Sequence, residues 1–373
     1  MMRVLYIARH FHPRMEGIVA AMAATGEAAI TLICPASWQD ELGLAKQSHQ
    51  PPNTYERIEL SMLGPPNDYH RALYRSLTFA LPTVQPQIIH AEEEPESLAA
   101  LQIAAAHRVF APRARLILNA WQNLDRPKRW YVKWVARLAF LSADAITCGN
   151  DGAVAVLRRT GYDGPAPVIP QKGVNTDLYH PQAVAPPTEH AGLRLLYAGR
   201  LLPEKDVETL LHALPLVAAA TTLRIVGDGP HRARLNELIT ELHLWNRVQL
   251  MPSVEPTALP ALFAQADALV LPSKTMPFWS EQLGRILLEA MACALPVIGS
   301  DSGAIPEVIG AAGLIFAEGN RDALAICIRQ LEADPGLRRR LGQLGRAQAE
   351  QFSERALAMR NLQLYHTLLD TDY

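Results

Sequence analysis

The sequence predicts an α/β protein built from two doubly wound parallel sheets, on three observations. Short apolar runs rich in β-branched residues alternate with helical patterns along the whole chain. Runs such as 30–34 and 268–271 are apolar on both faces, as the strands of a buried parallel sheet are. The length of 373 residues exceeds what one hydrophobic core usually supports, which favours two domains.

The expected strands follow in order along the two halves of the chain. In the first half they fall near residues 3–8, 29–34, 56–60, 87–91, 115–120, 145–149 and 167–170. In the second half they fall near residues 194–199, 222–227, 248–252, 268–272 and 296–300. The helical patterns between them imply right-handed crossovers, so each half is expected to form one doubly wound sheet.

A proline-rich stretch separates the two halves. The segment before the strand at residue 194 contains three prolines and no hydrophobic periodicity, which is typical of a linker. We therefore expect an N-terminal domain over residues 1–182, a linker over 183–192, a C-terminal domain over 193–350 and a terminal helix over 351–373.

The composition excludes several classes of protein. The chain is 49% hydrophobic and 19% charged, a globular balance, and its net charge of −2 does not suggest a nucleic-acid partner. Cys34, Cys148, Cys293 and Cys327 stand far apart without a CxxC pair, so buried free thiols are expected rather than disulfides or a zinc site. The first apolar run is too short for a signal peptide, and no apolar window would span a membrane, which favours a cytoplasmic protein.

The strongest chemical signal is a pair of glutamates after the strand that ends near residue 272. Between Glu281 and Glu289 stands Gly284, which reads as the start of a helix. That start places Glu281 on a loop and Glu289 in the second helical turn. A glycine lets an anion approach the backbone amides there, and the helix dipole favours that anion. The arrangement suits the diphosphate of a nucleotide-diphosphate sugar; the alternative is an amphipathic helix with two solvated glutamates.

A second signal follows the first strand of the second half. Gly199, Arg200 and Lys205 stand close together at the carboxyl end of that strand, where doubly wound sheets bind ligands. A guanidinium and an ammonium suit a diphosphate, and the alternative is a solvated basic turn. The nearby Gly-x-Gly at residues 227–229 lacks the full dinucleotide-binding fingerprint.

These residues carry a resemblance to a known family. The second half resembles the nucleotide-sugar domain of the family 4 retaining glycosyltransferases, which have the GT-B fold. The family's E-x7-E motif matches Glu281 and Glu289, and its glycine-arginine…lysine motif matches Arg200 and Lys205. Similar segments are also found at residues 225–230, 266–273 and 299–307.

The resemblance implies a fold: two Rossmann-like domains would face each other across a cleft, with the terminal helix packing back on the N-terminal domain. It also implies roles. Arg200 and Lys205 would neutralise the diphosphate leaving group, while Glu281 would hold sugar hydroxyls and Glu289 the ribose hydroxyls. Donor binding would further involve Gly199, Gly227, Gln282, Leu283 and Gly284. One departure is Asp206, which stands where a glycine usually follows the lysine and places a negative charge near the diphosphate.

The first half resembles the family less closely. Where the family has a paired-glycine loop after the first strand, only Gly17 stands here. His90 fits a core histidine at least as well as a catalytic one. Glu92, Glu93 and Glu94 follow this histidine in the sequence. Either at least one of their side chains faces the cleft and binds acceptor hydroxyls, or all three belong to a solvated loop. We expect Gly17, Glu93 and Glu94 on the acceptor side.

Residues 126–141 combine cations with an aromatic stripe. At helical spacing one face carries Trp130, Trp134, Val135, Leu138 and Leu141, with lysines and arginines beside it. This pattern is typical of a helix lying in a membrane interface, and it would give peripheral contact with an anionic membrane. The alternative is an ordinary domain helix whose tryptophans belong to the core.

Together the motifs predict a retaining glycosyltransferase that moves a hexosyl or related sugar from a nucleotide-diphosphate sugar to a glycan or lipid-linked acceptor. No metal motif stands out, so no metal and no cofactor are expected, because cations and helix dipoles can stabilise the departing diphosphate. The enzyme would act in the cytoplasm, including as a peripheral protein at the inner face of the membrane. The alternatives are a nucleotide-sugar-binding module without catalysis and an epimerase or phosphorylase of the same fold.

Overall fold

The computed structural model describes residues 1–9, 16–37, 54–65, 68, 70–182 and 192–370. The chain divides into two compact units, unit 1 formed by Met1–Gly173 with Glu354–Tyr373 and unit 2 formed by Val174–Ser353. Val174 already belongs to unit 2, ahead of the boundary predicted at residue 182, because it pairs in parallel with Ser353. The predicted linker lies outside the described residues except for Gly192.

Unit 1 is organised around a parallel sheet of six strands. In chain order these are β1 (Met2–Ile7), β2 (Ala28–Pro35), β3 (Glu56–Leu60), β6 (Ile88–Ala91), β7 (Arg115–Ala120) and β8 (Ala145–Cys148). They lie in the order β3-β2-β1-β6-β7-β8. A small antiparallel pair, β4 (Met62–Leu63) and β5 (Leu73–Tyr74), stands apart from this sheet and was not expected from the sequence.

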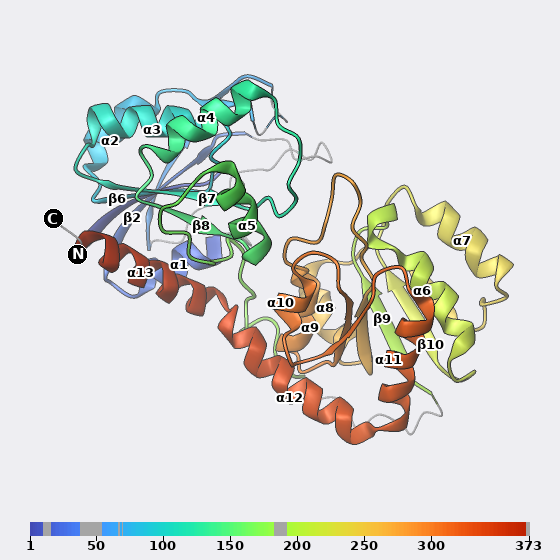
Figure 1. Ribbon diagram of the computed structural model, residues 1–373. Coiled ribbons are helices and arrows are strands. Elements are labelled where there is room, and N and C mark those ends of the chain that lie inside the picture. Colours follow the sequence, from blue (N-terminus) through green and yellow to red (C-terminus); the bar gives the residue numbers. More distant parts are fainter. Residues whose placement is uncertain (10–15, 38–53, 66–67, 69, 183–191, 371–373) are drawn as a thin grey trace. The chain divides into compact units, whose positions relative to one another are not determined.

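Helices cover both faces of this sheet, as a doubly wound fold requires (Figure 1). Leu5 and Ile7 of β1 point into one core, shared with α2 (Leu77–Val84), α3 (Leu98–Phe110) and α5 (Asp151–Thr160). Val4 and Tyr6 point into the opposite core, against α1 (Glu16–Ala24) and α13 (Glu354–Asp370). The remaining helix is α4 (Trp130–Phe140), which packs beside α3. The terminal helix therefore does pack on the N-terminal domain, as predicted.

Unit 2 repeats the same plan. Its strands are β9 (Arg194–Ala198), β10 (Thr222–Val226), β11 (Val248–Met251), β12 (Ala268–Leu271), β13 (Val297–Ser300) and β14 (Leu314–Phe316), in the order β11-β10-β9-β12-β13-β14. Its helices are α6 (Val207–Ala213), α7 (Arg232–Glu241), α8 (Leu259–Phe263), α9 (Arg285–Ala292), α10 (Ile305–Ile309), α11 (Arg321–Ala333) and α12 (Pro335–Gln351). Within this unit α6 packs beside α7 and α11, and α9 packs beside α10 and α12.

Both sheets reverse their strand order at one place. The reversal falls between β1 and β6 in unit 1 and between β9 and β12 in unit 2. Outside the carboxyl ends of the strands at such a point, the connecting loops diverge and leave room for a ligand. The chain segments after β1, β6, β9 and β12 are therefore where binding side chains are expected.

Two strand expectations differ from the structure. The stretch 167–170 forms only an isolated bridge, between Val168 and Cys148. Proline on both sides of Val168 removes the N–H donors that a ladder needs. The strand β14 was not predicted, because its apolar run is only three residues long.

The four cysteines are free thiols, and Cys293 is half-buried rather than buried.

Candidate active site

Lys205 and Glu281 meet at the strand-order reversal of unit 2. Lys205 ends a short 3-10 helix (Pro203–Lys205) after β9, and Glu281 follows β12. The Lys205 Nζ lies 2.6 Å from Glu281 Oε2, and Ser273 Oγ donates to the same oxygen at 2.9 Å. The ammonium also lies 4.7 Å from the centre of the Trp279 ring. Two residues far apart in sequence are thus joined into one charged cluster.

The backbone around Glu281 is held by the loop after β13. Ala304 N donates to Glu281 O at 2.8 Å. Gly303 adopts a left-handed φ of 55°, and a Cβ there would lie 2.1 Å from the same carbonyl oxygen. Only glycine permits this approach at that position. The backbone position of Glu281, which precedes α9, is therefore set by a contact between two loops.

Asp206 has the backbone conformation that explains the glycine usual at this position. Its φ is 47° and its ψ 40°, which is left-handed geometry that aspartate tolerates better than most residues. The carboxylate is buried and paired, since Lys274 Nζ lies 3.0 Å from one oxygen and Thr209 Oγ1 donates to the other at 2.7 Å. The negative charge of Asp206 is therefore balanced within the protein.

Arg200 extends from a turn that is braced by its neighbours. Tyr197 donates its hydroxyl to Arg200 O at 2.7 Å, and the residue itself is exposed. Gly199 and Gly227 lie against each other, because a Cβ on Gly227 would stand 1.9 Å from Gly199 O. Gly227 thus serves the close packing of the loops after β9 and β10. Arg200 therefore stands exposed on the loop that also carries Lys205, after β9.

The second glutamate of the motif lies on α9, as predicted. Gly284 caps the helix with a left-handed φ of 65°, and Arg285 is the first helical residue. Glu289 is 4% exposed and forms an ion pair with Arg285, whose Nε lies 3.1 Å from Glu289 Oε1. Leu283 is buried and Gln282 is half-buried just before the helix. The start of α9 follows Glu281 directly, and the first N–H groups of a helix have no intrahelical acceptor.

At the reversal point of unit 1 a buried ion pair is the main feature. Arg9 Nε and Nη2 donate to the two oxygens of Glu93 at 2.9 and 2.6 Å. Tyr74 and Ser97 add hydroxyl donors to the same carboxylate at 3.0 and 3.3 Å. Arg9 and Glu93 are 1% and 3% exposed. This carboxylate is occupied by internal partners, which is the arrangement of a structural pair.

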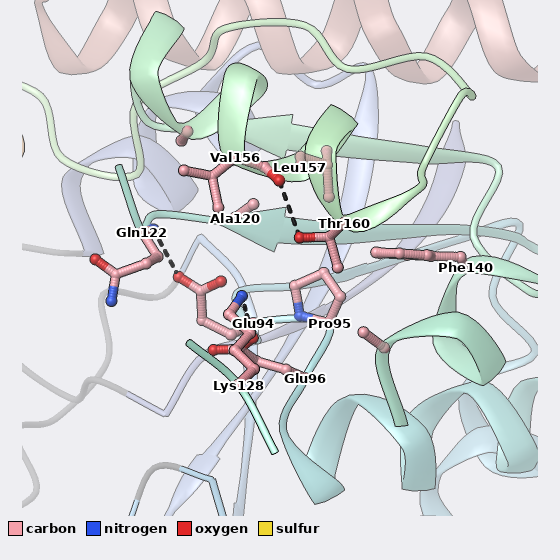
Figure 2. A pocket seen from close by; sticks show the side chains of 12 residues that line it. Glu94, Pro95, Glu96, Ala120, Gln122, Lys128, Phe140, Val156, Leu157 and Thr160 are labelled. Atoms are coloured by element: carbon pink, nitrogen blue, oxygen red, sulfur yellow. Dashed lines mark hydrogen bonds and ion pairs between the residues drawn. The ribbon is translucent and has the colours of Figure 1, made fainter. Parts of the chain in front are cut away.

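Glu94 borders a small pocket that Figure 2 shows together with Gln122 and the Glu96–Lys128 ion pair. One Glu94 oxygen accepts the backbone N–H groups of Trp121 and Gln122 at 2.7 and 3.0 Å. Burial and, next, the Glu96 carboxylate raise the pKa of Glu94 to about 7. The pocket volume of about 20 Å³ has room for little more than a water molecule. Glu94 is therefore placed at this edge, but not in a sugar-sized cavity.

Glu92 is the neighbour whose carboxylate keeps an oxygen without a partner. Tyr6 donates its hydroxyl to Oε1 at 2.5 Å, while buried Oε2 has no hydrogen-bond partner among the described residues. Burial raises the pKa of Glu92 to about 7. From the sequence, Glu92 was one of three candidate glutamates, and Glu93 and Glu94 were preferred on the acceptor side. An unsatisfied buried carboxylate oxygen cannot be recognised from spacing, because it depends on which strands lie beside β6.

His90 and Gly17 have structural partners in unit 1. His90 is buried, its Nδ1 lies 2.7 Å from the Tyr365 hydroxyl, and burial lowers its pKa to about 3. It is thus a core histidine. Gly17 is the second residue of α1, and a Cβ there would lie 2.0 Å from the Glu354 carboxylate carbon of α13. Its lack of a side chain lets those two helices approach.

Several residues of the unit 2 cluster were not predicted from the sequence. Ser273 and Trp279 contact Glu281 and Lys205, and Ser300 donates to the backbone oxygen of Ser273. Ser273 stands inside a segment already noted for its resemblance, so its place after β12 was a usable signal. Trp279 carried no such signal. Within the described residues, no group of three or more His, Cys, Asp or Glu side chains could hold a metal ion.

Comparisons with known proteins assign the family. The model of the glycosyl transferases group 1 matches residues 186–348. The GDP-mannose-dependent alpha-(1-6)-phosphatidylinositol monomannoside mannosyltransferase of Mycobacterium tuberculosis is 31% identical over 270 residues, 65% of this chain and 68% of that protein. The chain therefore belongs to the glycosyl transferases group 1. Other relatives are matched over less of their length: for the enzyme of the same name from Mycolicibacterium smegmatis the identity is 33%, over 47% of this chain and 49% of that protein. The chain thus spans about half the length of several curated relatives that it matches.

Solved structures show the same fold over nearly the whole chain. A glycosyltransferase from Rickettsia africae has a TM-score of 0.76 at 16% identity, covering 100% of this chain and 99% of that one. Anabaena HepE in complex with UDP has a TM-score of 0.75 at 19% identity, covering 98% and 100%. The two six-stranded parallel sheets are thus those of a GT-B protein, as the sequence predicted. No helix in the described part of the chain is long and apolar enough to cross a membrane.

Proposed function

We propose that this protein transfers a sugar from a nucleotide-diphosphate sugar to a glycan or lipid-linked acceptor, with retention of configuration and without a metal or cofactor. The observation that carries the proposal is the Lys205–Glu281 contact at the carboxyl edge of unit 2. Arg200 stands on the same loop as Lys205, and α9 starts four residues after Glu281. Two cations and an open helix start suit a diphosphate. Relatives act on GDP-mannose by name, and a solved neighbour holds UDP.

In this proposal each residue has one task. Arg200 and Lys205 stabilise the charge that develops on the departing diphosphate, which lowers the barrier electrostatically. Glu281 accepts hydrogen bonds from sugar hydroxyls, and the amides around Leu283 and Gly284 bind the distal phosphate. Glu289 accepts hydrogen bonds from the ribose hydroxyls. Gly199, Gly227 and Gln282 shape the donor-binding surface around them.

The reaction step needs no protein nucleophile. The bond between the anomeric carbon and the diphosphate oxygen breaks, and the acceptor hydroxyl forms its bond on the same face. The hydroxyl proton passes to the departing phosphate oxygen, so charge and atoms balance. Acceptor hydroxyls would be held by unit 1, where Glu94 is a half-buried carboxylate after β6. Glu93 is engaged by Arg9, so its part is to fix this edge.

A donor screen tests the proposal. Thermal unfolding would be followed with uridine, guanosine and adenosine diphosphates and their sugars, since a ligand that binds the folded state raises the unfolding temperature. The stabilising nucleotide sugar would then be incubated alone and with EDTA, and the released sugar analysed by NMR. Slow hydrolysis that gives the retained anomer and survives EDTA supports the proposal. Binding without turnover would favour a binding module, a changed nucleotide sugar an epimerase, and a need for inorganic phosphate a phosphorylase.

The acceptor class also bears on where the protein works. The mycobacterial relative acts on a phosphatidylinositol mannoside by name, which supports a lipid-linked acceptor. An enzyme that uses cytoplasmic nucleotide sugars and such an acceptor would work at the inner face of the membrane. We propose this placement for the present protein.

A further inference from the structure

Helix α4 exposes its largest apolar side chains to solvent. Trp130 is 74% exposed, Trp134 55%, Leu138 46% and Leu141 69%. The interpretation that the tryptophans are core residues is therefore wrong. Helix α4 is attached through its opposite, small-residue face, where Ala136 and Ala139 are buried. Together with Phe140, which packs against Tyr162, these alanines attach the helix to unit 1 and leave the tryptophans at the surface.

A basic pocket opens beside this aromatic face. Its volume is about 430 Å³, and its lining consists of Asp125, Arg126, Pro127, Lys128, Lys133, Arg137, Arg159 and Thr160. Asp125 neutralises Arg159, at 3.0 Å, and Glu96 neutralises Lys128. Lys133 and Arg137 form no ion pair within the described residues, and Arg137 lies over the Trp134 ring at 5.9 Å. The pocket therefore carries an excess of positive charge.

The two features belong to one surface. Lys133 and Arg137 stand one helical turn apart on α4 and flank the stripe formed by Trp130 and Trp134. Large aromatic side chains beside cations match the boundary between acyl chains and phosphates in a bilayer. Lysine and arginine are the side chains that bind phosphate oxygens.

We propose that the pocket lined by Lys133 and Arg137 binds the phosphate of an anionic phospholipid, while Trp130 and Trp134 insert at the headgroup level. A second copy of the chain is a poorer occupant. A symmetric interface through this face would bring like charges of both copies together. The inference adds a lipid-binding surface to the proposed sugar transfer. It is measured without donor or acceptor, so its failure would leave the transfer proposal standing.

The test is co-sedimentation of the full chain with phosphatidylcholine vesicles that contain or lack phosphatidylglycerol. Binding is expected only with phosphatidylglycerol, and high salt should weaken it because screening shortens the reach of the cations. Charge reversal in Lys133→Glu/Arg137→Glu should lower binding about tenfold or more. The Trp130→Ser/Trp134→Ser variant should also bind the vesicles more weakly, but the effect of salt on its binding should be the same as for the unchanged chain. All four side chains are exposed, so the unfolding temperature should not change.

Matched controls come from other exposed positions. Arg339→Glu/Arg355→Glu reverses two exposed cations elsewhere, and Trp245→Ser removes a tryptophan that is 57% exposed in unit 2. These variants should sediment like the unchanged chain. Equal binding to both vesicle types, or unchanged binding of the tryptophan variant, would overturn the proposal. Displacement of the protein from vesicles by a low concentration of inorganic phosphate would also overturn it, because that result would indicate a site for a free anion. So would a dimer that depends on the tryptophans and forms equally with and without lipid.

Discussion

The ammonium of Lys205 lies 2.6 Å from the carboxylate of Glu281, joining the loop after β9 to the loop after β12. These two strands are hydrogen-bonded neighbours, although more than seventy positions separate the two residues. Each group neutralises the other. A diphosphate that binds here would become the counter-ion of Lys205 and leave the Glu281 carboxylate available to sugar hydroxyls. Binding of the diphosphate and binding of the sugar would therefore depend on each other.

Removal of either cation should slow sugar transfer. Arg200→Ala and Lys205→Ala are each expected to lower kcat by about a hundredfold or more, as loss of one charge-stabilising donor does. The double variant should lose less than the product of the two effects, because both groups act on one diphosphate. Steady-state kinetics of the three variants measure this. Arg339→Ala, at an exposed cation of α12, serves as the control, and full activity in Lys205→Ala would contradict the assignment.

Two substitutions of Glu281 separate binding from turnover. Glu281→Ala should depress kcat more than donor affinity if its contacts strengthen in the transition state. Glu281→Gln should retain the Ser273 hydrogen bond and most of the local structure, yet still lose the charge beside Lys205. Donor dissociation constants and single-turnover rates distinguish these effects. Wild-type values in both variants would remove Glu281 from the site.

Glu289→Gln is expected to weaken donor binding about tenfold with the fold intact, because a charge-assisted hydrogen bond to the ribose becomes a neutral one. Calorimetric titration with the stabilising nucleotide diphosphate provides the measurement. Glu237→Gln, on a solvent-facing position of α7, is the matched control. Equal loss of affinity in both variants would mean that the effect is general electrostatics and not a specific contact.

Glu92 makes the folded state pH-sensitive. Burial raises its pKa to about 7, above the ordinary value of 4.5 that applies when the chain is unfolded. Between these values the folded state keeps the proton that the unfolded state releases. The stabilising contribution is therefore complete below about pH 4.5 and lost as pH rises through 7, by about 3 kcal/mol for this group.

Glu92→Gln removes that loss, since the amide never ionises. The variant should match the unchanged protein near pH 4.5 and exceed it in free energy of unfolding at pH 8. Urea unfolding at the two pH values measures the difference. Asp163→Asn, at an exposed carboxylate of the same unit, should show no such gain. A Glu92→Gln variant that is less stable at pH 8 would show that the ionised carboxylate has a favourable partner.

The sequence predicted those features that depend on local patterns. Short apolar runs located the strands of both sheets except β14. Gly284 marked the start of α9 because its left-handed conformation is a local property. The spacing from Gly284 then placed Glu281 on the loop and Glu289 in the second turn. In each case neighbouring residues along the chain carry the information.

Features that depend on contacts across the fold could not be predicted. The counter-ion of Asp206 is Lys274, and that of Glu93 is Arg9, each supplied by a different strand end. Acidic residues after a strand look the same in sequence whether they face solvent or a buried arginine. The aromatic stripe of α4 was ambiguous for a similar reason, since the choice between core and surface depends on which helix face meets α3.

Helix α13 gives the chain an unusual order of assembly during synthesis. The residues of unit 2 leave the ribosome before α13 does, although α13 completes the core of unit 1. Until Tyr365 arrives, His90 lacks its hydrogen-bond partner and the β1 face around Tyr6 stays uncovered. The first unit to begin translation is therefore the last to finish folding, and a chain that stalls after residue 353 would expose that apolar face to chaperones and proteases.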